Sequence, residues 1–157
     1  MPPTDDHLLA LIPPGGPGDF ILVMDARGDV DMSAYAQLGY GNVVNSQAGR
    51  FDIERDFYPY PSAHFRTILC CDLIETLAHD PMYMMDEIHR ILRPGCHLVL
   101  STRRYPSGQI RELLENCGLE VTQLESSGDR VYSVGRKIGP LRERYPGWLY
   151  PRRSSRR

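Results

Sequence analysis

The fold we predict is determined by residues 51–102, FDIERDFYPYPSAHFRTILCCDLIETLAHDPMYMMDEIHRILRPGCHLVLST. Two apolar runs, TILCCDLIETL and HLVLST, flank a segment whose apolar side chains repeat at helical spacing: Met84, Ile88, Ile91 and Leu92. A strand, a helix and a second strand in this order are typical of a parallel βαβ unit with a right-handed connection.

The ends of the predicted helix carry signals of their own. Asp80 is expected to cap the first free backbone N–H groups, and Pro81 suits the first helical position, where a missing N–H costs nothing. Arg93 would lie at the negative end of the helix dipole. Pro94-Gly95 is expected to end the helix and turn the chain into the next strand.

The rest of the chain continues the alternation of strands and helices. Strands are expected at 19–25, 42–45, 119–125 and 130–135, with a further strand at 51–54, and helices at 32–38 and 107–117. Ser107 is a candidate N-cap, and Gly118 suits the position after a helix. The pattern predicts an α/β fold: a Rossmann-like, doubly wound, mostly parallel sheet of about six or seven strands with a C-terminal antiparallel hairpin.

Composition places the chain among ordinary globular domains. Apolar residues make up 41% and charged residues 24%, and the net charge is −2, so no overall field favours nucleic acid or an anionic membrane. No apolar run approaches the roughly 20 residues of a membrane span, and no signal peptide is recognisable. The four cysteines lack metal-binding spacing, which favours a reducing compartment and no metal site. We therefore expect a cytoplasmic protein with no membrane or nucleic-acid partner.

The C-terminal end differs in composition from the rest. Residues 1–139 read as a single domain, and residues 140–157 as an aromatic, then Arg-rich extension. Four apolar side chains in this extension are expected to fold back on the body or on another copy: Tyr145, Trp148, Leu149 and Tyr150. The arginines leave open a rival interpretation, a module that binds nucleic acid or an acidic partner.

Several short motifs in the middle of the chain carry a family resemblance. They are Glu54-Arg55-Asp56, Tyr58-Pro59-Tyr60-Pro61, Asp72-Leu73-Ile74-Glu75-Thr76-Leu77, Leu92-Arg93-Pro94-Gly95 and Leu98-Val99-Leu100-Ser101-Thr102. In order and spacing they resemble the second half of a class I S-adenosylmethionine-dependent methyltransferase domain of the type 11-like group. The resemblance implies S-adenosylmethionine as cofactor, no metal, and a small-molecule acceptor that the sequence does not name.

The resemblance also implies where the cofactor would bind. Ligands of open α/β sheets lie at the carboxyl ends of the strands. The implied cofactor-binding residues follow four strand ends: Asp25, Ala26, Arg27, Gly28, Asn45, Asp56, Cys71 and Asp72. Asp72 and Glu75 would lie near the acceptor, although Glu75 could equally cap the helix that follows. No residue is singled out as catalytic.

The sequence departs from the family pattern at these ligand positions. Arg27 replaces the first glycine of the turn and would bring a cation towards the positive sulfonium. Asn45 stands where an acid would accept the ribose hydroxyls, with Ser46 beside it. Two interpretations therefore remain open. One is a methyltransferase with a partly degenerate cofactor site, and the other is an inactive descendant acting as a homo-oligomeric interaction module, for example a homodimer.

Overall fold

The structure is a computed structural model that describes residues 6–26, 28, 31–46 and 51–138. In chain order its elements are α1 (Asp6–Leu11), β1 (Phe20–Asp25), α2 (Met32–Ala36), β2 (Asn42–Asn45), β3 (Phe65–Cys71), the 3₁₀ turn η2 (Ile74–Thr76), α3 (Met82–Ile91), β4 (Leu92–Thr102), α4 (Ser107–Asn116), β5 (Leu119–Ser127) and β6 (Arg130–Lys137). The elements expected from the sequence are present except the strand at 51–54, and several differ at their ends.

A six-stranded sheet forms the centre of the molecule, in the order β2-β1-β3-β4-β6-β5. The strands β2, β1, β3 and β4 pair in parallel, whereas β6 pairs antiparallel with both β4 and β5. The predicted mostly parallel sheet with a C-terminal antiparallel hairpin is thereby confirmed.

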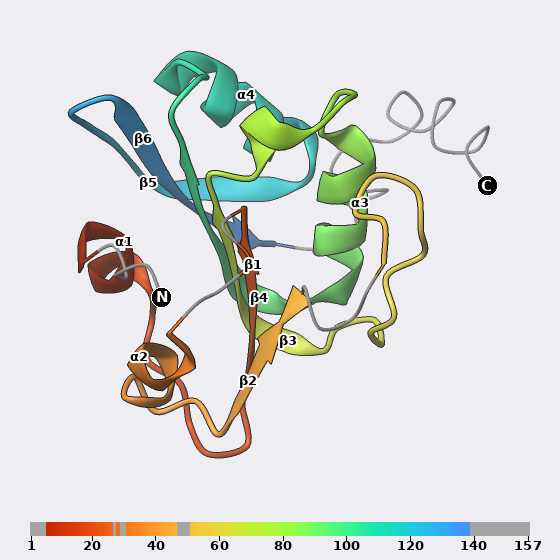
Figure 1. Ribbon diagram of the computed structural model, residues 1–157, viewed down its shortest axis with the longest axis vertical. Coiled ribbons are helices and arrows are strands. Elements are labelled where there is room, and N and C mark those ends of the chain that lie inside the picture. Colours follow the sequence, from red (N-terminus) through yellow and green to blue (C-terminus); the bar gives the residue numbers. More distant parts are fainter. Residues whose placement is uncertain (1–5, 27, 29–30, 47–50, 139–157) are drawn as a thin grey trace.

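Helices cover both faces of this sheet, with α1 and α2 on one side and α3 and α4 on the other (Figure 1). Because side chains alternate along a strand, each central strand contributes to both layers. On β1, Ile21 and Val23 pack in the layer of α1 and α2, while Leu22 packs in the layer of α3 and α4. The fold is therefore doubly wound, as predicted.

The crossover helix α3 begins at Met82, with Pro81 as its N-cap and not, as expected, its first residue, and it ends earlier than expected. Asp80 accepts a hydrogen bond from the Met82 N–H at 3.0 Å, so the predicted cap is confirmed. The helix ends at Ile91, however, and not at Pro94-Gly95. Leu92 already pairs with Phe65, and residues 93–96 bulge out before β4 resumes its pairing at His97. The prediction that Pro94-Gly95 ends the helix was wrong; these residues form the bulge, in which Gly95 has a φ of +79°.

A second difference concerns residues 51–64, which form a loop with no strand at 51–54. The loop's backbone is held by side chains of α3 instead of by a neighbouring strand. Glu87, which is fully buried, accepts a hydrogen bond from the Tyr58 N–H at 3.0 Å. Arg90 donates to the carbonyls of Tyr58 and Tyr60, each at 3.0 Å. Within the described residues, β2 is consequently an edge strand of the sheet.

The expected N-cap of helix α4 was also wrong. Ser107 is its first residue and not its N-cap; Pro106 precedes it without a capping side-chain hydrogen bond. At the other end Gly118 has a φ of +79° and donates its N–H to the Glu115 carbonyl at 3.1 Å, as expected for a residue that ends a helix.

The glycine-rich loop before β1 packs closely across the segment that leads into β2. The Gly15 N–H donates to the Leu38 carbonyl at 3.1 Å, and the Gly41 N–H to the Gly16 carbonyl at 3.2 Å. The two segments approach so closely that a Cβ at Gly41 would lie 1.6 Å from the Pro17 carbonyl oxygen. Only glycine fits there, because the obstructing atom is backbone and cannot swing away.

We therefore expect Gly41→Ala to lower the free energy of unfolding by at least about 2 kcal/mol, since one backbone segment must shift. Gly18→Ala is the matched control, because a Cβ at Gly18 would meet nothing within 4 Å. Urea unfolding of both variants measures the difference. Equal stabilities of the two variants would show that the crossing is not tight.

Candidate functional site

The carboxyl ends of three strands meet in register at one edge of the sheet. Asp25 of β1 lies opposite Cys71 of β3, and Cys71 lies opposite Ser101 of β4. The pairing continues beyond β1, because the Ala26 N–H donates to the Cys71 carbonyl at 3.1 Å. This is the edge at which ligands of open α/β sheets bind.

The turn after β1 is a compact structure around Gly28. Asp25 is 2% exposed, and its carbonyl accepts the Gly28 N–H at 3.0 Å. Gly28 has a φ of +80°, a backbone conformation that favours glycine. Asn45 at the end of β2 donates its side-chain amide to the Gly28 carbonyl at 3.1 Å. Arg27 lies outside the described residues, so its effect on a bound sulfonium stays a prediction.

Ser46, directly after β2, presents a buried hydroxyl at the same edge. Its side chain is 4% exposed, and its Oγ has no hydrogen-bond partner within the part of the chain that the structure describes. A buried hydroxyl left unpaired costs about 1–3 kcal/mol. Such a group marks a place where a ligand can supply the missing partner.

Asp72, the residue after β3, is held by three other side chains. Its carboxylate accepts the Ser101 hydroxyl at 3.0 Å and the Arg130 guanidinium at 2.7 Å, and the Arg103 guanidinium lies 3.7 Å away. Asp72 has a φ of +51°, in the left-handed region that Asp tolerates better than most residues. The hydrogen bond from Arg130 to Asp72 raises the pKa of the guanidinium, so Arg130 stays charged.

The Asp72–Arg130 ion pair is partly buried, and we expect its loss to be costly. Arg130→Met should lower the free energy of unfolding by about 1–3 kcal/mol, because it leaves Asp72 with a weaker set of donors. Arg136→Met is the matched control on the same strand, since Arg136 pairs with the exposed Glu120 and such surface pairs contribute about 0–1 kcal/mol. Chemical denaturation of both variants gives the comparison. A larger loss from Arg136→Met would contradict this account of the site.

Asp56, predicted as a cofactor residue, binds other groups. Its carboxylate accepts the Asp52 N–H at 2.7 Å, within its own loop, and its carbonyl accepts the Tyr83 hydroxyl at 2.9 Å from α3. The remaining described members of the predicted set come together at the strand ends: Asp25, Ala26, Gly28, Asn45, Cys71 and Asp72. A contact between Asp56 and a cofactor stays a prediction.

Two glutamates near this edge have structural roles that the sequence did not indicate. Glu75 does not cap α3; it accepts the Thr102 hydroxyl and the Arg103 N–H, each at 2.8 Å, and so joins η2 to the end of β4. Glu54 accepts the backbone N–H groups of Ala78 and His79 at 3.0 and 2.9 Å. These hydrogen bonds to the backbone, the one from Ala78 first, lower the pKa of Glu54.

A lowered pKa in the folded state means that ionised Glu54 stabilises the fold above its unfolded-state pKa. This contribution is lost as the pH falls through the folded-state pKa. Glu54→Gln should therefore lower the melting temperature at pH 7, and the difference from the parent protein should vanish in acid. Glu120→Gln, which removes an exposed carboxylate, serves as control. A deficit of Glu54→Gln that persists unchanged to pH 3 would show that the charge is not responsible.

The described residues offer neither a metal site nor a membrane-spanning helix. No group of three or more His, Cys, Asp or Glu side chains there could hold a metal ion. No helix in the described part of the chain is long and apolar enough to cross a membrane. None of the four cysteines forms a disulfide. Burial raises the pKa of the Cys70 thiol, so Cys70 on β3 is packed as a small apolar residue.

The sequence analysis did not identify the side chains that bind Asp72. Ser101 could have been placed, because parallel pairing of two equally long apolar runs aligns their ends. Arg130 carries no such signal. It is 58 positions away, and only the antiparallel return of β6 along β4 brings it to the acid.

A mostly parallel sheet with helices on both faces and an antiparallel end matches the class I methyltransferase fold. A family described as a methyltransferase domain matches residues 22–100, and the chain belongs to this family. A comparison with curated protein sequences gave no significant match.

Solved structures agree with this assignment. The complex of the Haloferax volcanii Trm112 methyltransferase activator with its methyltransferase matches at a TM-score of 0.69 and 17% identity, covering 85% of this chain and 88% of the other. A Burkholderia thailandensis 1,6-didemethyltoxoflavin-N1-methyltransferase matches at 0.66 and 12%, covering 85% and 78%. An Aquifex aeolicus SAM-dependent methyltransferase matches at 0.60 and 13%, covering 77% and 83%. At such identities the likeness shows a common fold.

Proposed function

We propose that this chain binds S-adenosylmethionine at the carboxyl ends of β1, β2 and β3 and transfers its methyl group to a small-molecule acceptor. The observation that carries the proposal is the buried, unpartnered hydroxyl of Ser46 beside the Gly28 turn, as far as the structure describes the chain. A ligand bound at this edge could supply the partner that the Ser46 hydroxyl lacks.

The residues at this edge fit the cofactor's parts. The Gly28 turn and the buried Asp25 would hold its amino-acid part, and the side chains of Asn45 and Ser46 would bind the ribose hydroxyls. The bound cofactor would supply a methyl group on a positively charged sulfur. The protein's own contribution would be to position the reactants and exclude water, which is where most of the rate gain of such a transfer arises.

A small-molecule acceptor is favoured by one of the structural neighbours. The Burkholderia thailandensis enzyme was solved with 1,6-didemethyltoxoflavin and S-adenosylhomocysteine bound. For this chain both a small acceptor and the cofactor are part of the proposal. We also propose a cytoplasmic location, in keeping with the four free cysteines.

The affinity for the cofactor should be modest. A neutral amide and a hydroxyl replace the carboxylate that would make charge-assisted hydrogen bonds with a ribose, and such bonds are about twice as strong as neutral ones. The proposed cofactor site is partly degenerate because it lacks this carboxylate.

Ser46→Ala tests the proposed role directly. We expect it to weaken S-adenosylmethionine binding about two- to tenfold, the value of one neutral hydrogen bond. The melting temperature without ligand should stay the same or rise, because the variant removes an unpaired buried hydroxyl. Titration calorimetry and thermal unfolding measure the two effects. Ser133→Ala is the control, since its buried Oγ is also unpartnered but lies on β6. Equal affinities of the two variants for S-adenosylmethionine would show that Ser46 does not contact the cofactor.

The alternative is an inactive protein that uses the fold for association, for example as a homodimer. The observation in its favour is that the Asp72 carboxylate is already bound by Arg130 and Ser101. The same titration separates the two proposals. If neither S-adenosylmethionine nor S-adenosylhomocysteine binds at millimolar concentration, methyl transfer is ruled out and association becomes the leading function.

A further inference from the structure

We propose that the C-terminal extension, residues 140–157, docks on the chain's own body, with Trp148 in a hollow between α3 and α4. Two residues that line this docking site follow strand ends: Ile74 comes two residues after Asp72, and Tyr105 comes three residues after the end of β4. The sequence left open whether the aromatic residues of the extension cover the body or another copy. The structure supplies a site of suitable shape, chemistry and position for the first of these.

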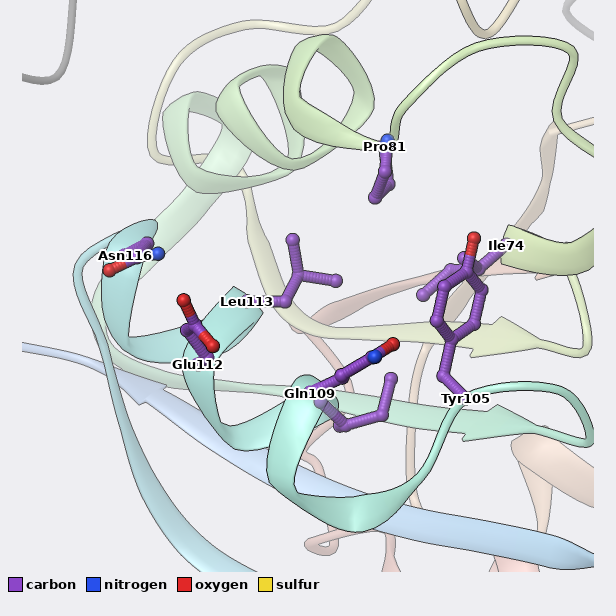
Figure 2. Close-up of a pocket in the computed structure, with 8 residues that line it drawn as sticks. Ile74, Pro81, Tyr105, Gln109, Glu112, Leu113 and Asn116 are labelled. Carbon is purple, nitrogen blue, oxygen red and sulfur yellow. The ribbon is translucent and has the colours of Figure 1, made fainter.

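The hollow has a volume of about 260 Å³ and lies between the start of α3 and the exposed side of α4 (Figure 2). Its apolar lining comes from Ile74, Pro81, Tyr105, Ile110 and Leu113, and Leu113 points into its centre. Its polar rim comes from Gln109, Glu112 and Asn116. An apolar floor with a hydrogen-bonding rim suits a side chain such as Trp or Tyr, which is apolar over most of its surface and polar at one end.

The chain leaves the described body beside this hollow. Lys137, the last residue of β6, pairs with Leu119, three positions after the rim residue Asn116. The Lys137 ammonium donates to the carbonyls of His89 and Leu92, at 2.7 and 2.8 Å, where α3 ends. The extension therefore starts between the C-terminal ends of the two helices that flank the hollow.

The extension is long enough to reach every part of the hollow. The ten residues of α4 span about 15 Å. At about 3.3 Å per extended residue, Tyr145 can lie up to about 23 Å from Ile138, and Trp148 up to about 33 Å. The residues between Ile138 and Tyr145 thus form a linker that needs no strain to place Trp148 over Leu113.

Local concentration favours the chain's own extension over that of a second copy, which carries the same charges. Arg144 and Arg152 flank the aromatic residues, and the exposed acid Glu112 on the rim suits a segment with basic neighbours. A short linker gives a tethered segment an effective concentration of the order of millimolar. The extension of a second molecule, present at micromolar concentration, would have to compete with this higher effective concentration.

Trp148 is the chain's only tryptophan, so its fluorescence reports on this segment alone. In the full-length protein we expect blue-shifted emission and weak quenching by acrylamide. Leu113→Gln should shift the emission to the red and increase the quenching. Glu112→Arg should do the same through the rim, without disturbing the packing beneath it. Leu9→Gln is the matched control, because Leu9 is similarly half-buried but lies on α1, on the opposite face of the sheet.

Three outcomes would overturn the proposal. Emission of the parent protein typical of a solvent-exposed tryptophan would show that the segment is not docked. A buried tryptophan unaffected by both hollow variants would place the segment elsewhere. Emission that shifts to the red on dilution, together with a dimer in sedimentation analysis, would show docking on a second copy. Circular dichroism of each variant confirms that the body is folded.

Discussion

The parallel pairing of β3 with β1 on one side and β4 on the other is the constraint on which the rest of the structure depends. It places Asp25, Cys71 and Ser101 in one line across the sheet. This alignment also sets the positions of Ala26, Gly28 and Asp72, because these residues come directly after the ends of β1 and β3. A shift of one residue in either pairing would turn the apolar side chains of β3 to the wrong face and separate the polar groups at the edge.

The loop at residues 51–64 shows how a short chain keeps this fold without a further strand. Loop backbone groups that would otherwise be buried without partners are bonded by Glu87 and Arg90 of α3. The two side chains also pair with each other at 3.1 Å, so the buried carboxylate is compensated. Buried charges are tolerated only when paired and hydrogen-bonded in this manner. The same helix thus closes the core on one side and holds the loop on the other.

Local patterns in the sequence were sufficient for most of the fold. The spacing of Met84 and Ile88 and the cap at Asp80 identified α3, and the apolar runs identified β1, β3 and β4. The errors arose where tertiary contacts outweigh local signals. Pro94-Gly95 reads as a helix end, yet the pairing of Leu92 with Phe65 ends the helix earlier. The predicted strand at 51–54 is absent, and side chains of α3 hold the loop that follows it through hydrogen bonds to Tyr58 and Tyr60.

The sequence predicts at which strand ends the site residues lie. It does not predict which side chains they contact. The strand ends follow from the apolar runs, so Asp25, Asn45 and Asp72 were placed at one edge. The partners of Asp72 come from distant strands, and the burial of Ser46 depends on packing that the sequence does not show. We therefore propose that the polar groups assembled by β1, β2 and β3 form the binding site.

Hydrogen–deuterium exchange of the full-length protein with and without S-adenosylhomocysteine tests this claim most directly. Ligand bound at the proposed edge should slow exchange of the backbone amides in residues 24–28, 44–46 and 70–73, because those segments contact or border it. Exchange in α4 should be unchanged. Protection confined to the hollow between α3 and α4, or protection nowhere at saturating ligand, would contradict the account.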